Sequence, residues 1–247
     1  MDLNVDMGES FGRYLLGNDA EIMKYITSAN IACGFHAGDP MVIEKTVRLA
    51  KENNVAVGAH VGLHDKQGFG RRRLDISKDE LKNDILYQIG ALTAFLRAHD
   101  MKLQHVKPHG ILYRMTEDEI IYADALLEAI KSYDSNLYIF TERKTILWER
   151  GINDGFKMIS EAFIDLDYDD EGKWVLEKIK KAKSPKEVVE RAILVTTEKR
   201  IKTISGKFFN MDCDTMCCHG DAPNALEIVR KVKEEFDKRN IILRNFL

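Results

Sequence analysis

The sequence predicts an α/β fold in which about seven parallel strands close into an irregular (β/α) barrel. Short apolar segments alternate with segments of helical periodicity along the 247 residues, a pattern that calls for parallel strands joined by right-handed crossovers. Polar and ionisable residues follow nearly every apolar segment, and closing the sheet would bring these strand ends to one rim. An open doubly wound sheet fits the first observation, but it would leave the outer strand ends too far apart to share a substrate.

Composition narrows the class of protein. Hydrophobic residues make up 45% of the chain and charged residues 31%, as in ordinary globular proteins. A formal net charge of -3 does not indicate binding to nucleic acid or to an anionic membrane. No stretch of the sequence approaches the roughly 18 apolar residues of a transmembrane helix. The acidic N-terminus is unlike a signal peptide, and the four cysteines are unlike a disulfide framework. We therefore expect a cytoplasmic protein with one domain over residues 1–247 and no nucleic-acid or membrane partner.

In the first half of the chain, apolar strands are expected at residues 3–5, 28–32 and 55–60, and a further strand ends within 104–110. Helices are expected at 20–25, 41–53 and 81–99. Gly34 and Gly38 allow a sharp turn after the second strand, and Pro40 suits the first turn of the helix that follows. Ser77 and Glu80 form a capping-box pattern before the helix at 81–99.

In the second half, strands are expected at 137–140, 156–160 and 214–218, with a further short strand at 241–243. Helices are expected at 117–131, 143–150, 186–200 and 224–239, the last of them strongly amphipathic. Residues 165–185 are charged and irregular, so no regular element is predicted there.

Four of the seven histidines stand directly after apolar segments: His36, His60, His109 and His219. One histidine in such a place is more often a structural hydrogen-bond donor, but four at equivalent places indicate chemistry. Carboxylates accompany them at Asp6, Glu9, Asp39, Glu161 and Asp221. Two chemistries stay open: acid–base catalysis by histidine–carboxylate pairs, and a metal site of mixed nitrogen and oxygen ligands, with candidate ligands Asp6, His36, His60 and His109.

Two basic features could bind an anion. Lys107 follows a strand and would point to the rim, where it could stabilise an oxyanion or a phosphate; a salt-bridged lysine is an equal alternative. The run 71–73 is three arginines after a glycine-rich loop, and a guanidinium can clamp a carboxylate or phosphate in bidentate fashion. As a bare charge run it would more often be solvated. No Walker A phosphate-binding motif is present.

Several motifs resemble the LamB/YcsF family. They stand in the family's order over nearly the whole chain: DLNVDMGESFG at 2–12, SANIACGFHAGDP at 28–40, GAHVG at 58–62, QGFGRR at 67–72, YQIGAL at 87–92, VKPHGILY at 106–113 and CHGD at 218–221. The resemblance implies an irregular (β/α) barrel related to the polysaccharide deacetylases. It also implies a subunit of the prokaryotic 5-oxoprolinase, which works with two partner subunits.

The implied reaction is the ATP-dependent opening of 5-oxo-L-proline to L-glutamate, with ATP as co-substrate. Phosphorylation of the amide oxygen would make the carbonyl carbon electrophilic, so that an activated water could attack it. The motifs suggest the catalytic residues Asp6, Glu9, His36, His60, Lys107, His109, Glu161, His219 and Asp221. They suggest the substrate- or phosphate-binding residues Asn30, Asp39, Arg71 and Arg72. A divalent metal is compatible with the same set.

The chain departs from the family pattern in one stretch. Where the pattern reads Glu-Val-Phe-Ala-Asp-Arg-Ala-Tyr, Leu166 stands in place of the arginine. Where it reads Leu-Val-Pro-Arg, the arginine is replaced by Glu177, and the following Pro-Gly is Lys180 and Lys181. A guanidinium paired with an anion contributes on the order of 1.5–3 kcal/mol. Either the arginines at 71–73 compensate, or the substrate is different or less anionic.

Two other functions remain open. One is a stand-alone metal-dependent amidohydrolase or deacetylase, which would bind stoichiometric metal and cleave an amide without ATP. The other is a non-catalytic member that only binds partner subunits. In that case removal of all four strand-end histidines would leave folding, partner binding and the activity of the complex unchanged.

Overall fold

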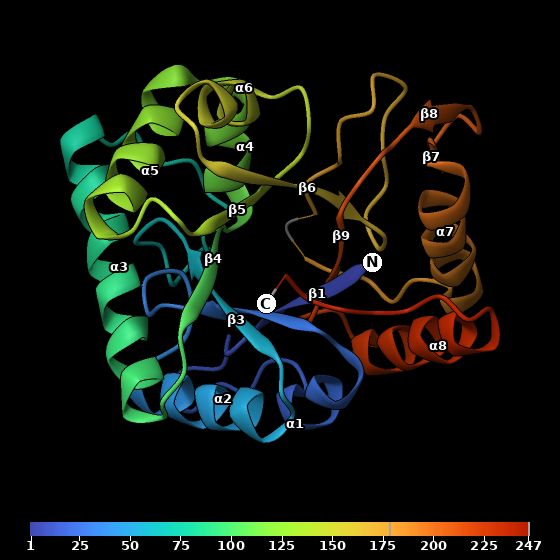
Figure 1. Cartoon of the computed structure of the whole chain (residues 1–247), viewed down its shortest axis with the longest axis horizontal. Helices are drawn as coiled ribbons and strands as arrows, with labels where there is room; N and C mark the ends of the chain where they lie inside the picture. The colour runs from blue at the N-terminus through green and yellow to red at the C-terminus, as the bar shows by residue number, and fades with distance from the viewer. Residues whose placement is uncertain (178, 247) are drawn as a thin grey trace.

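The computed structural model describes residues 1–177 and 179–246, and it contains the expected barrel (Figure 1). Seven parallel strands close in the order β1-β2-β3-β4-β5-β6-β9, and β9 pairs back onto β1. The strands are β1 (Asp2–Met7), β2 (Ser28–Ala32), β3 (Ala56–Val61), β4 (Leu103–Pro108), β5 (Tyr138–Thr141), β6 (Lys157–Phe163) and β9 (Thr215–His219). Each overlaps a predicted strand, so the predicted fold class is confirmed.

Helices surround the barrel on most sides (Figure 1). They are α1 (Asp19–Ile22) with the 3-10 turn η1 (Met23–Tyr25), α2 (Pro40–Glu52), α3 (Lys78–Ala98), α4 (Gly110–Asp118), α5 (Ile120–Tyr133), α6 (Ile146–Asn153), α7 (Pro185–Glu198) and α8 (Ala225–Lys238). Their starts follow local chemistry. Asp39 accepts from the amides of Met41 and Val42 ahead of α2, and Ser77 and Glu80 complete the predicted capping box of α3.

Three elements differ from the sequence-based expectation. The helix expected from 117 is two helices, α4 and α5, because Glu119 between them has an extended backbone. An antiparallel pair, β7 (Arg200–Lys202) and β8 (Phe208–Asn210), follows α7 and was not predicted. Its strands are only three residues long, too short for a recognisable alternation.

The strand expected at 241–243 was wrong, because those residues form no strand. The C-terminal segment instead runs beneath the barrel beside the N-terminus, where the backbone amide of Arg244 donates to the carbonyl of Met1. Phe246 packs its ring against Tyr138 and Phe140 of β5. Of the apolar residues that suggested a strand, Ile241 and Leu243 pack against the hydrophobic core, whereas Ile242 is exposed.

The barrel interior is unusually polar. Alternate residues of the strands point inward, and on β1 these are Asp2, Asn4 and Asp6, all buried. Asn4 donates to Glu161 at 2.9 Å and to Thr215 at 2.7 Å. The strands therefore bury hydrogen-bonding side chains that fix one another, rather than aliphatic layers, and this network holds the rim residues from below.

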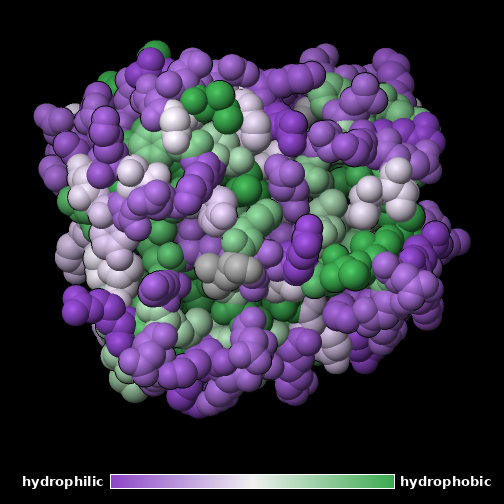
Figure 2. All heavy atoms as spheres, viewed as in Figure 1, coloured by the Kyte–Doolittle hydropathy of each residue, from purple (hydrophilic) through white to green (hydrophobic). Residues whose placement is uncertain are grey.

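The outer surface is ordinary by comparison. Figure 2 shows hydrophilic side chains over most of the viewed face, with hydrophobic ones gathered toward its middle. None of the described helices is long and apolar enough to cross a membrane.

Gly58 offers a test of the polar interior. A Cβ at this position would overlap the imidazole of His105, which is held by Gln104 and by Asn30 at 2.7 Å. Gly58→Ala should therefore lower the free energy of unfolding by about 1–3 kcal/mol, because the buried ring has nowhere to move. Chemical denaturation measures this change.

Gly90→Ala is the matched control. Gly90 lies within α3, and nothing stands within 4 Å of a Cβ placed there. This substitution should stabilise the protein by about 0.5–1 kcal/mol through helix propensity. Equal stability of the two variants would contradict the crowding at Gly58.

Candidate functional site

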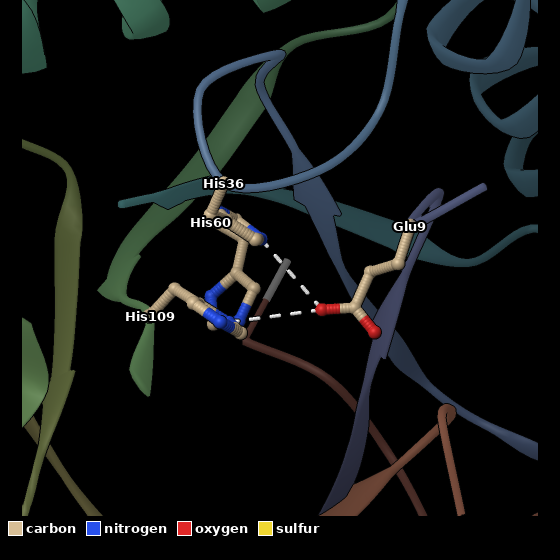
Figure 3. A group of neighbouring side chains, drawn as sticks. All are labelled: Glu9, His36, His60 and His109. Atoms are coloured by element: carbon tan, nitrogen blue, oxygen red, sulfur yellow. Dashed lines mark hydrogen bonds and ion pairs between the residues drawn. The ribbon is translucent and has the colours of Figure 1, made fainter. Parts of the chain in front are cut away.

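Three histidines and one glutamate meet at the rim of the barrel (Figure 3). Glu9 follows β1, His36 follows β2, His60 lies in β3, and His109 follows β4. One ligand atom from each lies within 4.8 Å of the others, and all four side chains are buried. The rings of His36 and His109 are stacked with their centroids 3.7 Å apart. Segments far apart in the sequence are thus brought together by closure of the sheet, as predicted.

Glycines make room for this cluster. A Cβ at Gly62 would overlap the ring of His36, and a Cβ at Gly70 would press on His36 and His109. Gly70 also has a positive φ of 61°, which favours glycine. The glycine-rich loop of the sequence therefore serves to pack backbone against the imidazoles.

The hydrogen bonds of His60 and His109 fix where their protons lie. Nδ1 of His60 lies 3.1 Å from the carbonyl oxygen of Lys107, and Nε2 of His109 lies 2.8 Å from that of Phe69. A carbonyl can only accept, so each of these nitrogens carries a proton. The remaining nitrogens, Nε2 of His60 and Nδ1 of His109, then point lone pairs at each other across 2.9 Å. Either an additional proton or a cation must lie between them.

Burial sets the charge state of the rest of the cluster. It lowers the pKa of His36 and of His109 well below the usual value, so both are neutral at pH 7. Burial, reinforced by Asp221 and Asp6, raises the pKa of Glu9 well above its usual value. Among the described residues, neither ring nitrogen of His36 has a hydrogen-bond partner. The cluster therefore contains imidazole nitrogens whose lone pairs have no hydrogen-bond donor among the described residues.

These observations fit a metal ion. Neutral imidazoles with free lone pairs and a carboxylate are the donors that zinc and similar divalent ions take. The orphaned nitrogens of His36 and the facing lone pairs of His60 and His109 would all find a partner in one cation. The group of Glu9, His36, His60 and His109 could thus hold a metal.

A second buried group lies directly beneath. Nζ of Lys107 is 3.0 Å from Asp6, 3.0 Å from Glu161 and 2.9 Å from Sγ of Cys217. Burial opposes ionisation of Asp6, but His60 and Lys107 outweigh it and hold the pKa of Asp6 well below its usual value. Asp6 also lies 3.2 Å from Nε2 of His60, so an ionised carboxylate is available to that imidazole.

His219 forms a separate pair with Asp165. Nδ1 of His219 lies 2.9 Å from the carboxylate of Asp165, which also accepts from the backbone amide of His219. Burial opposes ionisation of Asp165, but His219 outweighs it and holds the pKa of that carboxyl below its usual value. The carboxylate fixes the tautomer and leaves Nε2 of His219 free to accept a proton.

A small pocket opens above these groups. Its polar lining is Asp6, His60, Arg71, Lys107, His109, Lys180 and His219. Its apolar lining is Pro108, Tyr113, Phe163, Leu166, Trp174 and Leu176. The pocket therefore combines proton-transferring and cationic groups with aromatic and aliphatic ones, a lining suited to a small polar ring.

Comparison with known proteins places this geometry in a family. The model of the LamB/YcsF family matches residues 1–247. The chain belongs to the LamB/YcsF family. Relatives that carry the name of a 5-oxoprolinase subunit match it end to end: one from Pyrococcus abyssi is 46% identical over 100% of this chain and 99% of its own length. One from Staphylococcus epidermidis is 41% identical over 99% of this chain and 98% of its own.

Solved structures agree. A lactam utilization protein from Thermus thermophilus superposes with a TM-score of 0.92 at 38% identity, covering 100% of this chain and 99% of that one. A family 4 carbohydrate esterase from Streptomyces lividans shares the fold alone, with a TM-score of 0.51 at 11% identity, covering 97% of this chain and 88% of the other. The predicted fold class is thereby confirmed.

Only some of the predicted site residues of this LamB/YcsF chain reach the pocket. Six line it directly: Asp6, His60, Arg71, Lys107, His109 and His219. Glu9 and His36 stand behind His109, and Glu161 lies beneath Lys107. Arg71 lines the pocket and pairs with Asp221 at 2.6 Å.

Three predicted binding residues have other partners. Asn30 is buried in the barrel, where it donates to Asp6 at 2.8 Å. Asp39 caps α2 and accepts from the amide of Gly12 at 2.7 Å. Arg72 pairs with Asp65 and does not line the pocket. The structure thus assigns these three side chains contacts that hold the rim.

Sequence reasoning missed Asp165, Lys180 and the aromatic wall. Asp165 follows β6 by two residues, so its place after a strand could have indicated it. Lys180 and Trp174 lie in the irregular segment, where no periodicity shows which side chains turn inward. Glu117 was also missed: it is buried on α4 and accepts from Nε1 of Trp174 at 3.1 Å, behind the pocket wall.

Glu117 gives the site a measurable pH dependence. Burial raises its pKa from the ordinary 4.5 to about 8. The folded state therefore binds this proton more tightly than the unfolded state does, so the stability it contributes falls as pH rises from 4.5 to 8. Because Glu117→Gln stays neutral, its free energy of unfolding should rise by about 1–3 kcal/mol relative to that of the wild type between about pH 6 and pH 8.5. Denaturant unfolding at the two pH values measures this change.

Glu119→Gln is the control. Glu119 pairs with Arg73, which lowers the pKa of Glu119, so Glu119 is ionised at both pH values. The difference in free energy of unfolding between Glu119→Gln and the wild type should therefore be the same at both. A difference for Glu117→Gln that is constant with pH would refute the assignment.

Proposed function

We propose that this chain is a subunit of an ATP-dependent 5-oxoprolinase, acting with two partner subunits to open the lactam of 5-oxo-L-proline to L-glutamate. Relatives at 41–46% identity carry the name of a 5-oxoprolinase subunit. The observation that carries the proposal is the pocket that His109, His219 and Lys107 line together with aromatic and aliphatic side chains. A five-membered lactam has one apolar edge and one amide edge, and this lining offers partners for both.

The proposed chemistry begins with activation of a poor electrophile. The lactam oxygen attacks the γ-phosphorus of ATP, forming an O–P bond and releasing ADP. Water then adds to the carbonyl carbon and gives up a proton, and the C–N bond breaks as the ring nitrogen gains one. A second water hydrolyses the resulting acyl phosphate to the γ-carboxylate of glutamate and inorganic phosphate.

The chain's own residues have distinct roles in this proposal. Nε2 of His219, oriented by Asp165, accepts the proton of the attacking water and can return it to the departing nitrogen. Lys107 and Arg71 place positive charge where the oxyanion and the phosphoryl group develop. Asp6 and Glu161 hold Lys107 in its place.

We propose further that Glu9, His36, His60 and His109 hold a divalent cation. When bound, such an ion supplies Lewis-acid polarisation of a carbonyl or phosphoryl oxygen. The carbonyl oxygen of Lys107, which lies 3.1 Å from Nδ1 of His60, would orient that imidazole so that its Nε2 points to the cluster.

The same cluster favours a second candidate, a stand-alone metal-dependent amidohydrolase. The supporting observation is that the four potential ligands lie within 4.8 Å of one another, in a chain whose sequence has no Walker A motif. Loss of 5-oxo-L-proline without ATP and without partner subunits would favour this candidate over the first.

The first test is turnover by the reconstituted complex. His36→Ala or His109→Ala should reduce ATP-dependent loss of 5-oxo-L-proline by about a hundredfold or more, because each removes a lone pair from the cluster. Circular dichroism should show that the variants remain folded. His64→Ala is the control, since His64 is exposed and stacks on Phe35 outside the pocket. Full activity of either cluster variant would refute the assignment.

The second test is metal binding by the purified chain. We expect about one Zn²⁺ or Co²⁺ per chain, with affinity that rises with pH because Glu9 and the proton between His60 and His109 must be released. Equilibrium dialysis and the Co²⁺ absorption spectrum measure this. His36→Ala should weaken binding, whereas His64→Ala should not. Failure of the wild-type chain to bind either ion at about pH 8 would exclude the metal.

A further inference from the structure

Three cationic side chains line the pocket, and two of them are engaged by carboxylates of the chain. Arg71 pairs with Asp221 at 2.6 Å, and Lys107 lies between Asp6 and Glu161. The third is Lys180, which is partly buried. Among the described residues, no carboxylate forms an ion pair with its amine. Lys180 thus brings a positive charge to the pocket that the described part of the protein does not neutralise by direct pairing.

Lys180 lies on the same side of the pocket as the His219–Asp165 pair. Burial raises the pKa of Asp165, but the larger effect of His219 and the smaller effect of the Lys180 charge together lower it. The segment that carries it also brings Trp174 and Leu176 into the lining. A ring packed against that apolar surface would therefore have both the proton acceptor of His219 and the amine of Lys180 within the same pocket.

The two positions where the family pattern has arginine supply no cation here. Leu166 lines the pocket with an aliphatic side chain. Glu177 is not part of the lining, and its carboxylate pairs with Lys183 at 2.6 Å. The missing positive charge is therefore not restored at either position, and the arginines at 72 and 73 pair with Asp65 and Glu119 instead.

We infer that Lys180 is a specificity-determining residue that binds the carboxylate of the cyclic-amide substrate. The inference rests on the proposed function and adds how this chain distinguishes an anionic lactam from a neutral one. An ammonium without a protein counter-ion at a partly desolvated position gains most from an anionic ligand. The apolar wall holds the ring, and Lys180 selects rings that bear a carboxylate.

The experiment uses the reconstituted complex with Lys180→Met, which keeps most of the side-chain length and removes the charge. The KM for 5-oxo-L-proline should rise by about ten- to a hundredfold, the worth of one charge-assisted hydrogen bond, while kcat changes little. Lys180→Arg should restore most of the affinity. Lys181→Met is the matched control, because Lys181 is exposed and does not line the pocket.

Calorimetry provides a readout independent of turnover. Lys180→Met should weaken binding of 5-oxo-L-proline and leave binding of 2-pyrrolidinone, the same ring without a carboxylate, unchanged. If the wild-type complex is active and the Lys180→Met complex has the same KM for 5-oxo-L-proline, this inference alone is overturned. A wild-type complex that cannot hydrolyse 5-oxo-L-proline would overturn the proposed function and the inference with it.

Discussion

The buried ammonium of Lys107 is the interaction on which the site depends. It lies 3.0 Å from each of two carboxylates, Asp6 and Glu161, in a barrel interior with almost no solvent exposure. Removing one partner of a buried ion pair typically costs about 3–5 kcal/mol, because the remaining charges are left uncompensated. His60 and Lys107 together keep Asp6 ionised, and the ionised Asp6 lies 3.2 Å from Nε2 of His60. A cation deep in the barrel in this way sets the protonation of groups at the rim.

The same environment separates two carboxyl groups that are both near the histidines. Asp6 has a lowered pKa because His60 and Lys107 outweigh burial, whereas Glu9 has a raised pKa because burial and the neighbouring Asp221 act together. One carboxyl is thus a permanent anion and the other readily holds a proton. Two carboxyls with opposite shifts are a common basis for distinct roles in one site. The barrel achieves this by placing only one of them next to the buried lysine.

The sequence was sufficient to predict the barrel and much of its rim. Fully buried parallel strands read as short apolar segments, and the polar residue that ends each one must reach the rim once the sheet closes. This is why His60, His109 and His219 could be placed. Periodicity carries no information on side-chain partners within the barrel, so it could not show that Asn30 holds Asp6 or that Asp39 caps a helix. It also failed for residues 165–185, where Asp165 and Lys180 reach the pocket from irregular backbone.

The proposed use of an ammonium, Lys180, to bind a carboxylate has a consequence for recognition. An arginine binds a carboxylate with two parallel hydrogen bonds and so fixes its plane, whereas a lysine acts as a point charge and leaves the orientation open. In this chain the orientation must then come from elsewhere. Trp174 supplies a flat surface for a ring, and its indole is fixed by Glu117 and by Arg114, whose guanidinium stacks 4.3 Å from the ring centroid. In the proposed function the apolar lining sets the shape of the bound ring and Lys180 supplies the charge, so the pocket would select an anionic lactam without an arginine at position 166.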